Sequence, residues 1–414
     1  MEADRYFLTA EQAAAALGVT KATLYAYTSR GLLRSEPAPG RPRERRYSRE
    51  DMERLRERKE IRRDPAQATA RGLHWGQPVL ESGITLIHEG GLYYRGHDAI
   101  QFAQTASLEQ TAGLLWAAEP SEAEGLFQRE SAHAPRGLPH LRAGDPLSLL
   151  QASLPLAAAA DRRSHHLRPA AVRQTGARIL NMLTRIAAHC DRQGPAHSVL
   201  QIGWAPRCPA AADAIRAALV LSADHELNVS AFVARCAASA QASPYDVVAA
   251  ALATLKGSLH GGATERVAAL LAEVQTPRRA TAVLASRLRR GERIPGFGHP
   301  LYPRGDPRAA LLLRLAEASG NRAEWRLVRS LRSAGARLLD DLPNLDFGLV
   351  ALARAYRLPE PAPLLLFALG RTVGWIAHAI EQYADGHLIR PRARYTGPVP
   401  YAPLHAESPL FQRR

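Results

Sequence analysis

Residues 363–382 read PLLLFALGRTVGWIAHAIEQ, and apolar side chains recur along this stretch at the spacing of an α-helix. The same spacing recurs in ALVLSADHELNVSAFVARCAASA at residues 218–240 and in VVAAALATLKGSLHGG at residues 247–262. Such helices bury one stripe against their neighbours, so the chain from Gly72 onward predicts a mainly α protein.

Two other parts of this region do not follow helical spacing. In GITLIHEGGLYYRG, residues 83–96, two extended runs flank Glu89, Gly90 and Gly91, which predicts a β-hairpin. Residues 128–170 are rich in Arg, Pro and His and predict no particular element.

The composition restricts the class of protein. The chain has 414 residues, a length typical of two or three domains, and 46% of them are hydrophobic, which is typical of a globular fold. A net charge of +15 suits nucleic acid or an anionic substrate, although charge alone identifies no partner. Three widely spaced cysteines form no CxxC pair, so they predict no metal or redox centre. There is no apolar window of 18 residues and no secretory signal, so we expect a cytoplasmic protein that does not span a membrane.

The N-terminal segment has its own pattern. LTAEQAAAALGVTKATLYAYTSRGLL at residues 8–33 predicts two short helices with a turn at Gly18, because Thr9 and Thr20 can cap their starts. The apolar side chains expected to face inward are Ala13, Ala14, Leu17, Leu24 and Tyr27. A loop rich in Pro, Gly and Arg is predicted to follow, and then a charged helix; these are PAPGRPRERRYS at residues 37–48 and REDMERLRERKEIRR at residues 49–63.

Residues 1–63 resemble the MerR-type or excisionase-like winged helix-turn-helix domain. The resemblance implies that the second helix enters the DNA major groove and that a basic wing contacts phosphates. It assigns Lys21, Thr23, Tyr25 and Tyr27 to the second helix, and Arg41, Arg43, Arg45, Arg46 and Tyr47 to the wing. The alternative is a small three-helix protein-interaction module. Residues 64–71 are polar and are predicted to form a linker.

Two motifs place histidines beside glycines. In GSLHGGATE, residues 257–265, His260 precedes two glycines that allow close backbone approach, so its ring could donate to a developing oxyanion. The alternative is a helix C-cap with a structural histidine. In IPGFGHPLYPRGDPRA, residues 294–309, a tight loop presents His299 and Arg308, which suit a carbonyl and a carboxylate. The alternative is an ordinary surface loop.

Three further residues are candidates for chemistry. Asp346 in DLPNLDFG has apolar neighbours, which would raise its pKa toward that of a general base, although such an Asp is also a common turn or cap residue. His225 in ADHELNVSAF is either a site residue or a satisfied core histidine. Arg371 lies in an apolar helix and needs an anionic partner, either an acidic side chain or a bound polycarboxylate.

Together, and in this order, these motifs resemble the citrate synthase family from Gly72 to about Tyr401. The matching segments are LHGGATE, GFGH with DPRA, PNLDF, ADHELN, GRTVGWIAH with EQ, RPRARYTG and the shorter YRG. The resemblance implies a two-domain helical fold, with residues 72–262 and 357–414 in a large domain and residues 263–356 in a small one. It also implies a homodimeric acyltransferase of the tricarboxylic acid cycle that needs no cofactor and condenses acetyl-CoA with oxaloacetate and water to citrate and CoA.

The resemblance assigns a role to each motif residue. His260 matches the histidine that stabilises the enol, Asp346 the base that takes the methyl proton, and His299 the residue that polarises the oxaloacetate carbonyl. The residues matched to binding of the dicarboxylate and the citrate product are His225, Arg308, Arg371, Phe367 and, from the dimer partner, Arg390. The residues expected to lie along CoA are Ile294, Pro295, Gly296, Phe297, Gly298 and the neighbouring Arg304.

Some positions depart from the family pattern. Pro300 and Pro303 stand where many members have basic residues, and Arg304 could substitute for them. Ser222 replaces a histidine of some bacterial members, and His97 stands where Tyr is usual. Three functions therefore stay open: a citrate synthase, a related enzyme such as a 2-methylcitrate synthase using propionyl-CoA, and a DNA-binding regulator whose synthase-like domain senses a CoA ester or polycarboxylate. One extra methylene discriminates weakly, so the sequence does not separate the first two.

Overall fold

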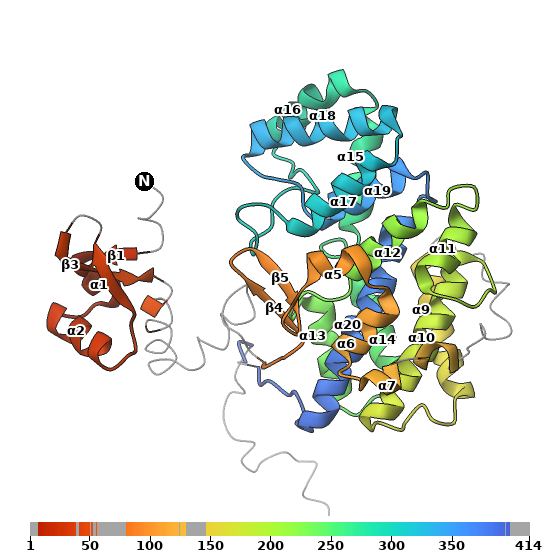
Figure 1. The fold of residues 1–414 in the computed structure, drawn as a ribbon, viewed down its shortest axis with the longest axis horizontal. Helices are drawn as coiled ribbons and strands as arrows, with labels where there is room; N and C mark the ends of the chain where they lie inside the picture. Colours follow the sequence, from red (N-terminus) through yellow and green to blue (C-terminus); the bar gives the residue numbers. More distant parts are fainter. Residues whose placement is uncertain are drawn as a thin grey trace, which may run out of the picture. The chain divides into compact units, whose positions relative to one another are not determined.

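The chain forms two compact units, Met1–Glu81 and Ser82–Arg414 (Figure 1). The structure is a computed structural model, and the residues that it describes are 7–38, 41–49, 51, 52, 55, 80–123, 125–129, 146–393 and 395–397.

Among its described residues, the first unit combines α-helices with a small antiparallel sheet. Its elements are β1 (Phe7–Thr9), α1 (Ala10–Leu17), α2 (Lys21–Ser29), β2 (Ser35–Ala38) and β3 (Arg41–Ser48), and the strand order is β1-β3-β2. The side chains of Thr9 and Thr20 accept the expected capping hydrogen bonds, from the backbone N–H groups of Gln12 and Thr23. Gly18 ends α1 with φ 58°, a left-handed conformation that suits glycine. The two predicted helices and their turn are therefore confirmed.

The described core of the first unit is built mainly from α1, α2, β3 and the segments that follow α2 and β3. Its buried side chains are Ala13, Leu17, Leu24, Leu33, Tyr47, Met52 and Leu55. Residues 37–48, predicted as a loop, lie in β2 and β3 wherever they are described. Strand β3 pairs with β1 on one side and with β2 on the other, and it buries Tyr47. Tyr47 is only 1% exposed, so it packs in the core rather than on the wing surface. Most of the predicted helix at residues 49–63, and the whole predicted linker, lie outside the described residues.

The second unit opens with the predicted hairpin. Strand β4 (Thr85–His88) pairs with β5 (Gly91–Tyr94), and β6 (His97–Asp98) pairs with the other edge of β5. The turn residues Glu89 and Gly90 have φ of 51° and 79°, as a two-residue type I′ turn requires. The hairpin prediction is confirmed.

Helices form most of the remaining described part of this unit (Figure 1). The first group is α5 (Ala99–Thr105), α6 (Leu108–Leu115), α7 (Pro120–Ala123), α8 (Leu126–Arg129), α9 (Pro146–Ala160), α10 (Pro169–Ala188), α11 (Ala196–Trp204), α12 (Ala211–Leu221), α13 (Val229–Ser239) and α14 (Pro244–Leu255). The second group is α15 (Ala263–Val274), the 3₁₀-helix η3 (Pro277–Arg279), α16 (Ala280–Arg289), α17 (Pro307–Ala318), α18 (Arg322–Leu339), α19 (Leu345–Ala355) and α20 (Ala362–Asp385). The prediction of a mainly α fold is confirmed, and α9 lies in the stretch for which the sequence predicted nothing.

Two hydrophobic cores organise these helices. The larger surrounds α20 and includes side chains of α5, α6 and α9 to α14, while the smaller is built mainly from α15, α16 and α18. Helices α17 and α19 join the two: Leu312 and Leu349 pack in the larger core, whereas Leu313 and Phe347 pack in the smaller one. This arrangement agrees with a large and a small domain, although the boundaries at residues 262 and 356 stay predictions.

Helix α20, whose sequence indicated the fold, runs through the larger core. By length and composition it could cross a membrane, but 94% of its most apolar window is buried inside the fold, as in a core helix. A Cβ at Gly370 would lie 2.5 Å from the Leu219 carbonyl oxygen, and one at Gly374 would lie 2.4 Å from that of Ala223. The two glycines therefore let α20 press against the turn that follows α12, and this contact positions Arg371 at that turn.

Candidate functional site

The loop that carries His299 is fixed by two glycines. Gly296 and Gly298 have φ of 86° and 72°, and a Cβ at Gly298 would meet the Asp341 carboxylate at 2.9 Å. The Gly298 amide donates to the Leu342 carbonyl at 2.9 Å, so the loop is bound to the segment before α19. The Phe297 ring lies against Gly335 of α18, where no larger residue would fit.

His299 is a neutral imidazole with a defined proton. Burial, reinforced by the charge of Arg308, lowers the pKa of His299 to about 4. The Leu301 backbone N–H donates to Nδ1 at 3.2 Å, so in the neutral ring the proton resides on Nε2. Nε2 can therefore donate a hydrogen bond to a carbonyl oxygen.

His225 lies against His299 although 74 residues separate them in the chain. The two ring centroids are 5.0 Å apart, and His225 Nε2 lies 3.0 Å from the Tyr302 hydroxyl. Burial, together with the nearby Arg308 and Arg371 charges, holds the pKa of His225 well below its usual value. The site thus holds two neutral imidazoles side by side, bridged by a buried tyrosine.

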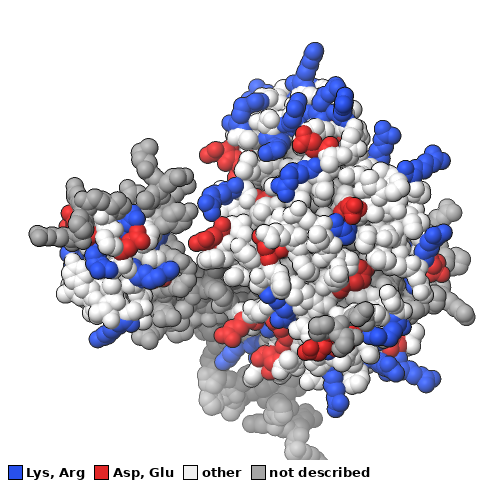
Figure 2. Space-filling model, viewed as in Figure 1, with Lys and Arg blue, Asp and Glu red and all other residues white. Residues whose placement is uncertain are grey.

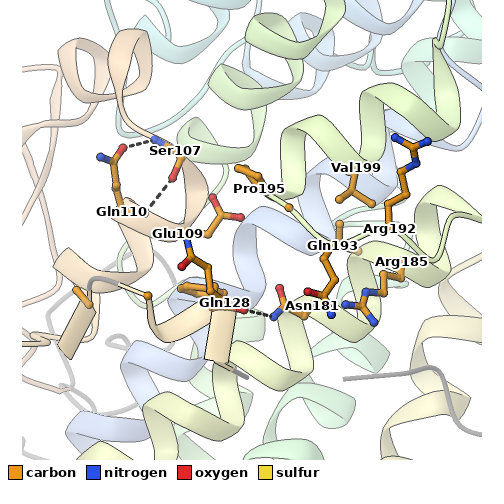
Figure 3. A pocket seen from close by; sticks show the side chains of 15 residues that line it. Ser107, Glu109, Gln110, Gln128, Asn181, Arg185, Arg192, Gln193, Pro195 and Val199 are labelled. Carbon is orange, nitrogen blue, oxygen red and sulfur yellow. Dashed lines mark hydrogen bonds between the residues drawn. The ribbon is translucent and has the colours of Figure 1, made fainter. Parts of the chain in front are cut away.

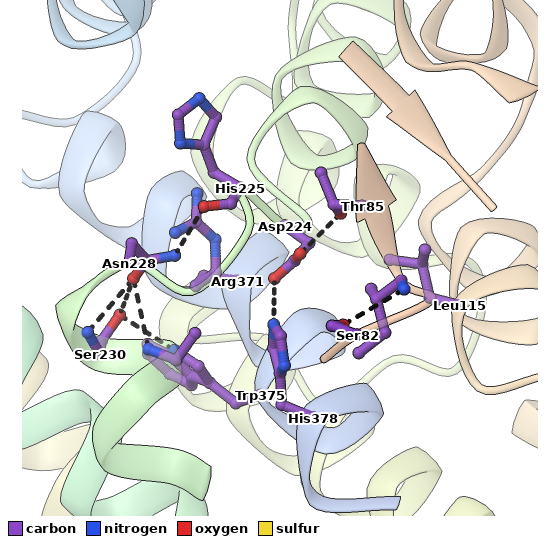
Figure 4. Close-up of polar contacts among 12 residues, drawn as sticks. Ser82, Thr85, Leu115, Asp224, His225, Asn228, Ser230, Arg371, Trp375 and His378 are labelled. Atoms are coloured by element: carbon purple, nitrogen blue, oxygen red, sulfur yellow. Dashed lines mark hydrogen bonds and ion pairs between the residues drawn. The ribbon is translucent and has the colours of Figure 1, made fainter. Parts of the chain in front are cut away.

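The turn that presents His225 is held by buried polar contacts (Figure 4). The preceding residue, Asp224, accepts a hydrogen bond from Thr85 Oγ1 at 2.6 Å and lies 3.3 Å from His378 Nε2 of α20. The Tyr94 hydroxyl donates to the Val220 carbonyl at 3.0 Å. The hairpin and α20 therefore fix the turn from two directions.

Two buried arginines supply positive charge, but they differ in their partners. Arg308 donates from Nε and Nη2 to both oxygens of Asp306, at 2.9 and 2.8 Å. Arg371 donates from Nε to the Ser222 carbonyl at 2.8 Å, and its terminal nitrogens form no ion pair with any described carboxylate. Burial lowers the pKa of Arg371 to about 10, and the nearby Asp224 charge opposes this shift. A buried guanidinium whose terminal nitrogens have no ion-pair partner can bind an anion.

His260 lies in the turn between α14 and α15 and contacts a polar cluster. Figure 4 shows the other members of this cluster, Asn228, Ser230 and Trp375. The His260 Nε2 is 2.8 Å from the Ser230 hydroxyl, which accepts from Trp375 Nε1 at 3.1 Å and donates to Asn228 Oδ1 at 2.8 Å. While the hydroxyl donates to Asn228, His260 Nε2 carries the ring proton; if the hydroxyl turns to donate to Nε2, the ring proton is on Nδ1. Burial lowers the pKa of His260 to about 4, so this ring is neutral too.

Asp346, in the first turn of α19, has the environment of a general base. Burial raises its pKa to about 6, the Arg308 charge opposes this rise, and Asp306 adds to it. Its Oδ1 is buried and accepts no hydrogen bond from a described residue. A carboxylate of this pKa is mostly ionised at neutral pH and can accept a proton.

Electrostatic contacts join these residues into one site. Arg371 influences the pKa values of His225, His260 and Asp346, and its guanidinium lies 4.8 Å from the centroid of the Phe367 ring. The Phe367 ring in turn lies 5.7 Å, edge to face, from that of His260. The structure therefore gathers the predicted catalytic and binding residues around Arg371, with the exception of Arg390. That residue follows α20, is exposed and makes no hydrogen bond or ion pair with a described residue.

The surroundings of the predicted CoA loop are mixed in charge. A cavity of about 310 Å³ beside His299 is lined by Arg304, Asp340 and Asp341 among others. Arg304 Nη2 donates to the Glu89 carbonyl of the hairpin at 3.0 Å, so this arginine is partly engaged. Ile294 packs against the smaller core. Among the described residues, no group of three His, Cys, Asp or Glu side chains is placed to hold a metal ion.

A cavity of about 430 Å³ lies elsewhere in the unit, among α6, α10 and α11 (Figure 3). Its polar lining includes Glu109, Asn181 and Arg185. None of the residues predicted for the site lines it.

Several positioning residues were not predicted. Tyr302 and Asp306 stand in the quoted loop sequence, and Ser230 and Asn228 follow His225 in the quoted helix. Their residue types are ordinary for turns and helix caps, and Asp306 and Asn228 do cap α17 and α13. Only their contacts with site residues distinguish them. Tyr302 contacts His225, and Asp306 pairs with Arg308. Ser230 contacts His260 and is itself bonded to Asn228.

The N-terminal residues assigned to DNA have varied surroundings. Tyr25 is 52% exposed, whereas Lys21 pairs with Glu11 at 2.8 Å. Arg45 donates to Ser35, and Arg46 pairs with Glu36. Thr23 bonds with Thr20, and Tyr27 packs partly against the core of this unit. The side chains of Arg41 and Arg43 lie outside the described residues.

The helical fold gathers a carboxylate of raised pKa, neutral imidazoles and two buried arginines, an arrangement that suits acid–base chemistry beside a bound anion. Family models match residues 72–392 as citrate synthase, C-terminal domain, and residues 7–60 as a helix-turn-helix domain. The chain belongs to the citrate synthase family and is an acyltransferase of the citrate synthase type, with a helix-turn-helix domain at its N-terminus.

Individual relatives agree with this assignment. Citrate synthase 2 of Bacillus subtilis is 29% identical over 357 residues, covering 79% of this chain and 96% of the relative. A 2-methylcitrate synthase of Mycobacterium tuberculosis is 32% identical over 336 residues, covering 74% and 84% respectively. The structure of a Thermoplasma acidophilum citrate synthase, a ternary complex with carboxymethyl coenzyme A and oxaloacetate, matches with TM-score 0.70 at 25% identity, covering 81% of this chain and 98% of that one.

Proposed function

We propose that the chain is a citrate synthase that condenses acetyl-CoA with oxaloacetate and water to give citrate and CoA. The observation that carries this proposal is the electrostatic setting of Arg371. This buried arginine forms no ion pair with a described carboxylate, although the charge of Asp224 acts on it, and it influences His225, His260 and Asp346 together. A dianionic keto-acid supplies the charge that this setting favours.

The enolisation step would use Asp346 and His260. The methyl group of a thioester is a weak acid, so its proton leaves only if a base removes it while the developing enol oxygen is stabilised. Asp346, whose pKa is about 6, would take the proton. His260 would donate to the enol oxygen through Nδ1, which requires that the Ser230 hydroxyl donates to Nε2.

The addition step would use His299 and the arginines. His299 Nε2–H would polarise the ketone of oxaloacetate, and Arg371, Arg308 and His225 would hold its carboxylates. The enol carbon then bonds to the ketone carbon, and water hydrolyses the thioester to release CoA. Closure of residues 263–356 over the rest of the enzyme domain would keep water out until that last step. Phe367 would line the site, and residues 294–298 with Arg304 would lie along CoA.

Two elements of this proposal concern assembly and location. We infer a homodimer in which Arg390 of one chain completes the site of the other, because this exposed arginine has no described partner in its own chain. We also infer a cytoplasmic enzyme that needs no cofactor.

The preferred thioester is open to direct measurement. Relatives named as 2-methylcitrate synthase are as similar to the chain as those named citrate synthase, so propionyl-CoA is the second candidate substrate. We expect CoA release from both thioesters with oxaloacetate, a higher kcat/KM for acetyl-CoA, and none with Asp346→Ala. A higher kcat/KM for propionyl-CoA would make the chain a 2-methylcitrate synthase. No release from either thioester, together with ligand-dependent DNA binding, would make it a regulator.

We infer that the helix-turn-helix unit binds DNA through exposed side chains of α2 and the β2–β3 wing. The exposed Tyr25 supports this assignment, together with the Lys21 and Arg45 side chains on the same unit. Salt-sensitive binding of duplex DNA should weaken in Tyr25→Ala and in Arg45→Ala, measured by fluorescence anisotropy. Unchanged binding in both variants would leave the protein-interaction module as the better description.

A further inference from the structure

Positive charge is concentrated in the second group of helices. The segment from residue 263 to residue 356 holds 16 arginines, no lysine and 9 acidic residues. Figure 2 shows many of the blue side chains gathered at the end of the larger unit that α16 and α18 occupy, with few red ones among them. This end of the unit is separate from the site around Arg371, which lies in the larger core.

Helix α18 carries a basic face. Arg322, Arg326, Arg329 and Arg337 are all exposed, and at about 100° per residue they fall within roughly 80° of one another. The exposed Arg332 lies about 60° beyond Arg329. The opposite face is apolar: Leu327, Val328, Leu331 and Ala334 pack in the smaller core. The amphipathic pattern therefore fixes these guanidinium groups toward solvent.

The 3₁₀-helix η3 extends this face sideways. The Ser330 hydroxyl of α18 donates to the Pro277 carbonyl at 2.6 Å, which holds η3 beside the middle of α18. The next two residues, Arg278 and Arg279, are exposed. We refer to Arg278, Arg279, Arg322, Arg326, Arg329 and Arg337 as the α18 basic surface.

These arginines differ from some of their neighbours in having no acidic partner. Arg287 pairs with Glu273, and Arg354 pairs with Glu324. No member of the α18 basic surface forms an ion pair with a described residue. Arg279 and Arg337 only donate to the neutral side chains of Gln275 and Thr281. Acidic side chains thus neutralise Arg287 and Arg354, whereas the α18 basic surface keeps its positive charge.

We propose that the α18 basic surface binds the phosphate backbone of duplex DNA, without sequence preference. From Arg322 to Arg337 the helix spans about 22 Å, a length over which a duplex carries about 13 negative charges. Arginine suits this partner because its guanidinium can form bidentate hydrogen bonds to phosphate oxygens. A helix that lies on a membrane would instead expose large apolar side chains among its cations. In η3 and α18 the exposed large apolar side chain is Leu338, which lies about 140° around the helix from the centre of the basic face.

The presence of a helix-turn-helix domain on the same chain favours DNA over other polyanions. The α18 surface would add a second, non-specific contact and lengthen the time that the chain spends on DNA. The proposal does not depend on DNA binding by the first unit, because variants of α18 leave that unit unchanged.

The test compares two fourfold variants of the full chain with equal charge. One is Arg278→Gln/Arg322→Gln/Arg326→Gln/Arg329→Gln. The control removes four exposed arginines from the other group of helices and their connections, Arg162, Arg168, Arg192 and Arg207, each replaced by Gln. Binding of a labelled duplex of about 20 base pairs, two helical turns, is measured by anisotropy. The measurement is repeated between about 50 and 200 mM salt.

Each phosphate contact contributes about 0.9 to the slope of log K against log salt, so four lost contacts should make the slope shallower by about 3.6. The control variant should keep the slope of the wild type. Equal slopes in the two variants, or no binding by the wild type, would overturn the proposal. So would a selective loss of binding to anionic phospholipid vesicles.

Catalysis provides the check on folding. None of the four substituted arginines belongs to the site around Arg371, so kcat and the KM for the thioester should equal those of the wild type. A raised thioester KM in the α18 variant alone would assign this surface to CoA and overturn the proposal.

Discussion

Lowering the pH from about 7 to about 5 is expected to reduce kcat/KM for the thioester about tenfold, because Asp346 becomes protonated. Its pKa of about 6 leaves the carboxyl roughly 90% ionised at pH 7 and roughly 10% ionised at pH 5. A carboxyl with the ordinary value of 3.8 would stay over about 90% ionised at pH 5. His260 and His299, with pKa values of about 4, remain neutral across this range. The fall in activity on the acidic side of the pH profile (the acid limb) therefore reports the protonation of Asp346.

The position of this limb should respond to a nearby charge. The exposed Arg266 lowers the pKa of Asp346, against the larger effect of burial, so Arg266→Gln should move the limb to higher pH. The expected shift is on the order of a few tenths of a pH unit, because solvent screens an exposed charge. Arg314→Gln removes an equally exposed charge from α17 and serves as the matched control.

The assay follows CoA release and yields kcat/KM for the thioester at saturating oxaloacetate, at a series of pH values from about 5 to about 8. A flat profile between pH 5 and pH 7 would refute the role of burial at Asp346. A limb that Arg266→Gln does not move would instead belong to another group, including an ionisation of CoA itself.

Three further substitutions test how the site is held. Asp306→Asn leaves the buried Arg308 without its charge partner and should cost about 3–5 kcal/mol of stability, seen as a lower midpoint of urea unfolding. Ser230→Ala frees the choice of protonated nitrogen on His260 and should lower kcat about tenfold or more, with the KM for oxaloacetate little changed. Gly374→Ala forces a methyl group into the turn after α12, should destabilise the enzyme by about 1–3 kcal/mol, and should raise the KM for oxaloacetate.

Matched variants separate these effects from general damage. In Asp306→Asn/Arg308→Gln both charges are absent, so the double variant should lose less stability than the two single variants summed; strict additivity would contradict the coupling. Ser239→Ala removes another hydroxyl from α13, one that donates only to the Cys236 carbonyl, and should leave kcat unchanged. A normal oxaloacetate KM in Gly374→Ala would contradict the placement of Arg371 by the contact between α20 and that turn.

Local patterns accounted for most of the secondary structure. The helix over residues 363–382 was predicted from its apolar spacing, and the structure buries it on all sides. The caps at Thr9 and Thr20 follow from hydroxyl groups beside unsatisfied amides. The hairpin followed from two extended runs around Glu89 and Gly90. The wing was the exception: its arginine-rich sequence predicted a loop, whereas sheet pairing with β1 and burial of one tyrosine made it a strand.

The sequence by itself determined the helical class, the family and the identity of the candidate site residues, because periodicity and short motifs are properties of neighbouring residues. Only the tertiary structure decided the state of those residues. Whether Asp346 is a base and whether Arg371 is unpaired depend on burial and on charges from distant helices. The same holds for Ser230, whose importance arises because α13 and the turn before α15 bring it to His260. Long-range packing sets the dielectric and the hydrogen-bond partners of a side chain, and no local pattern encodes either.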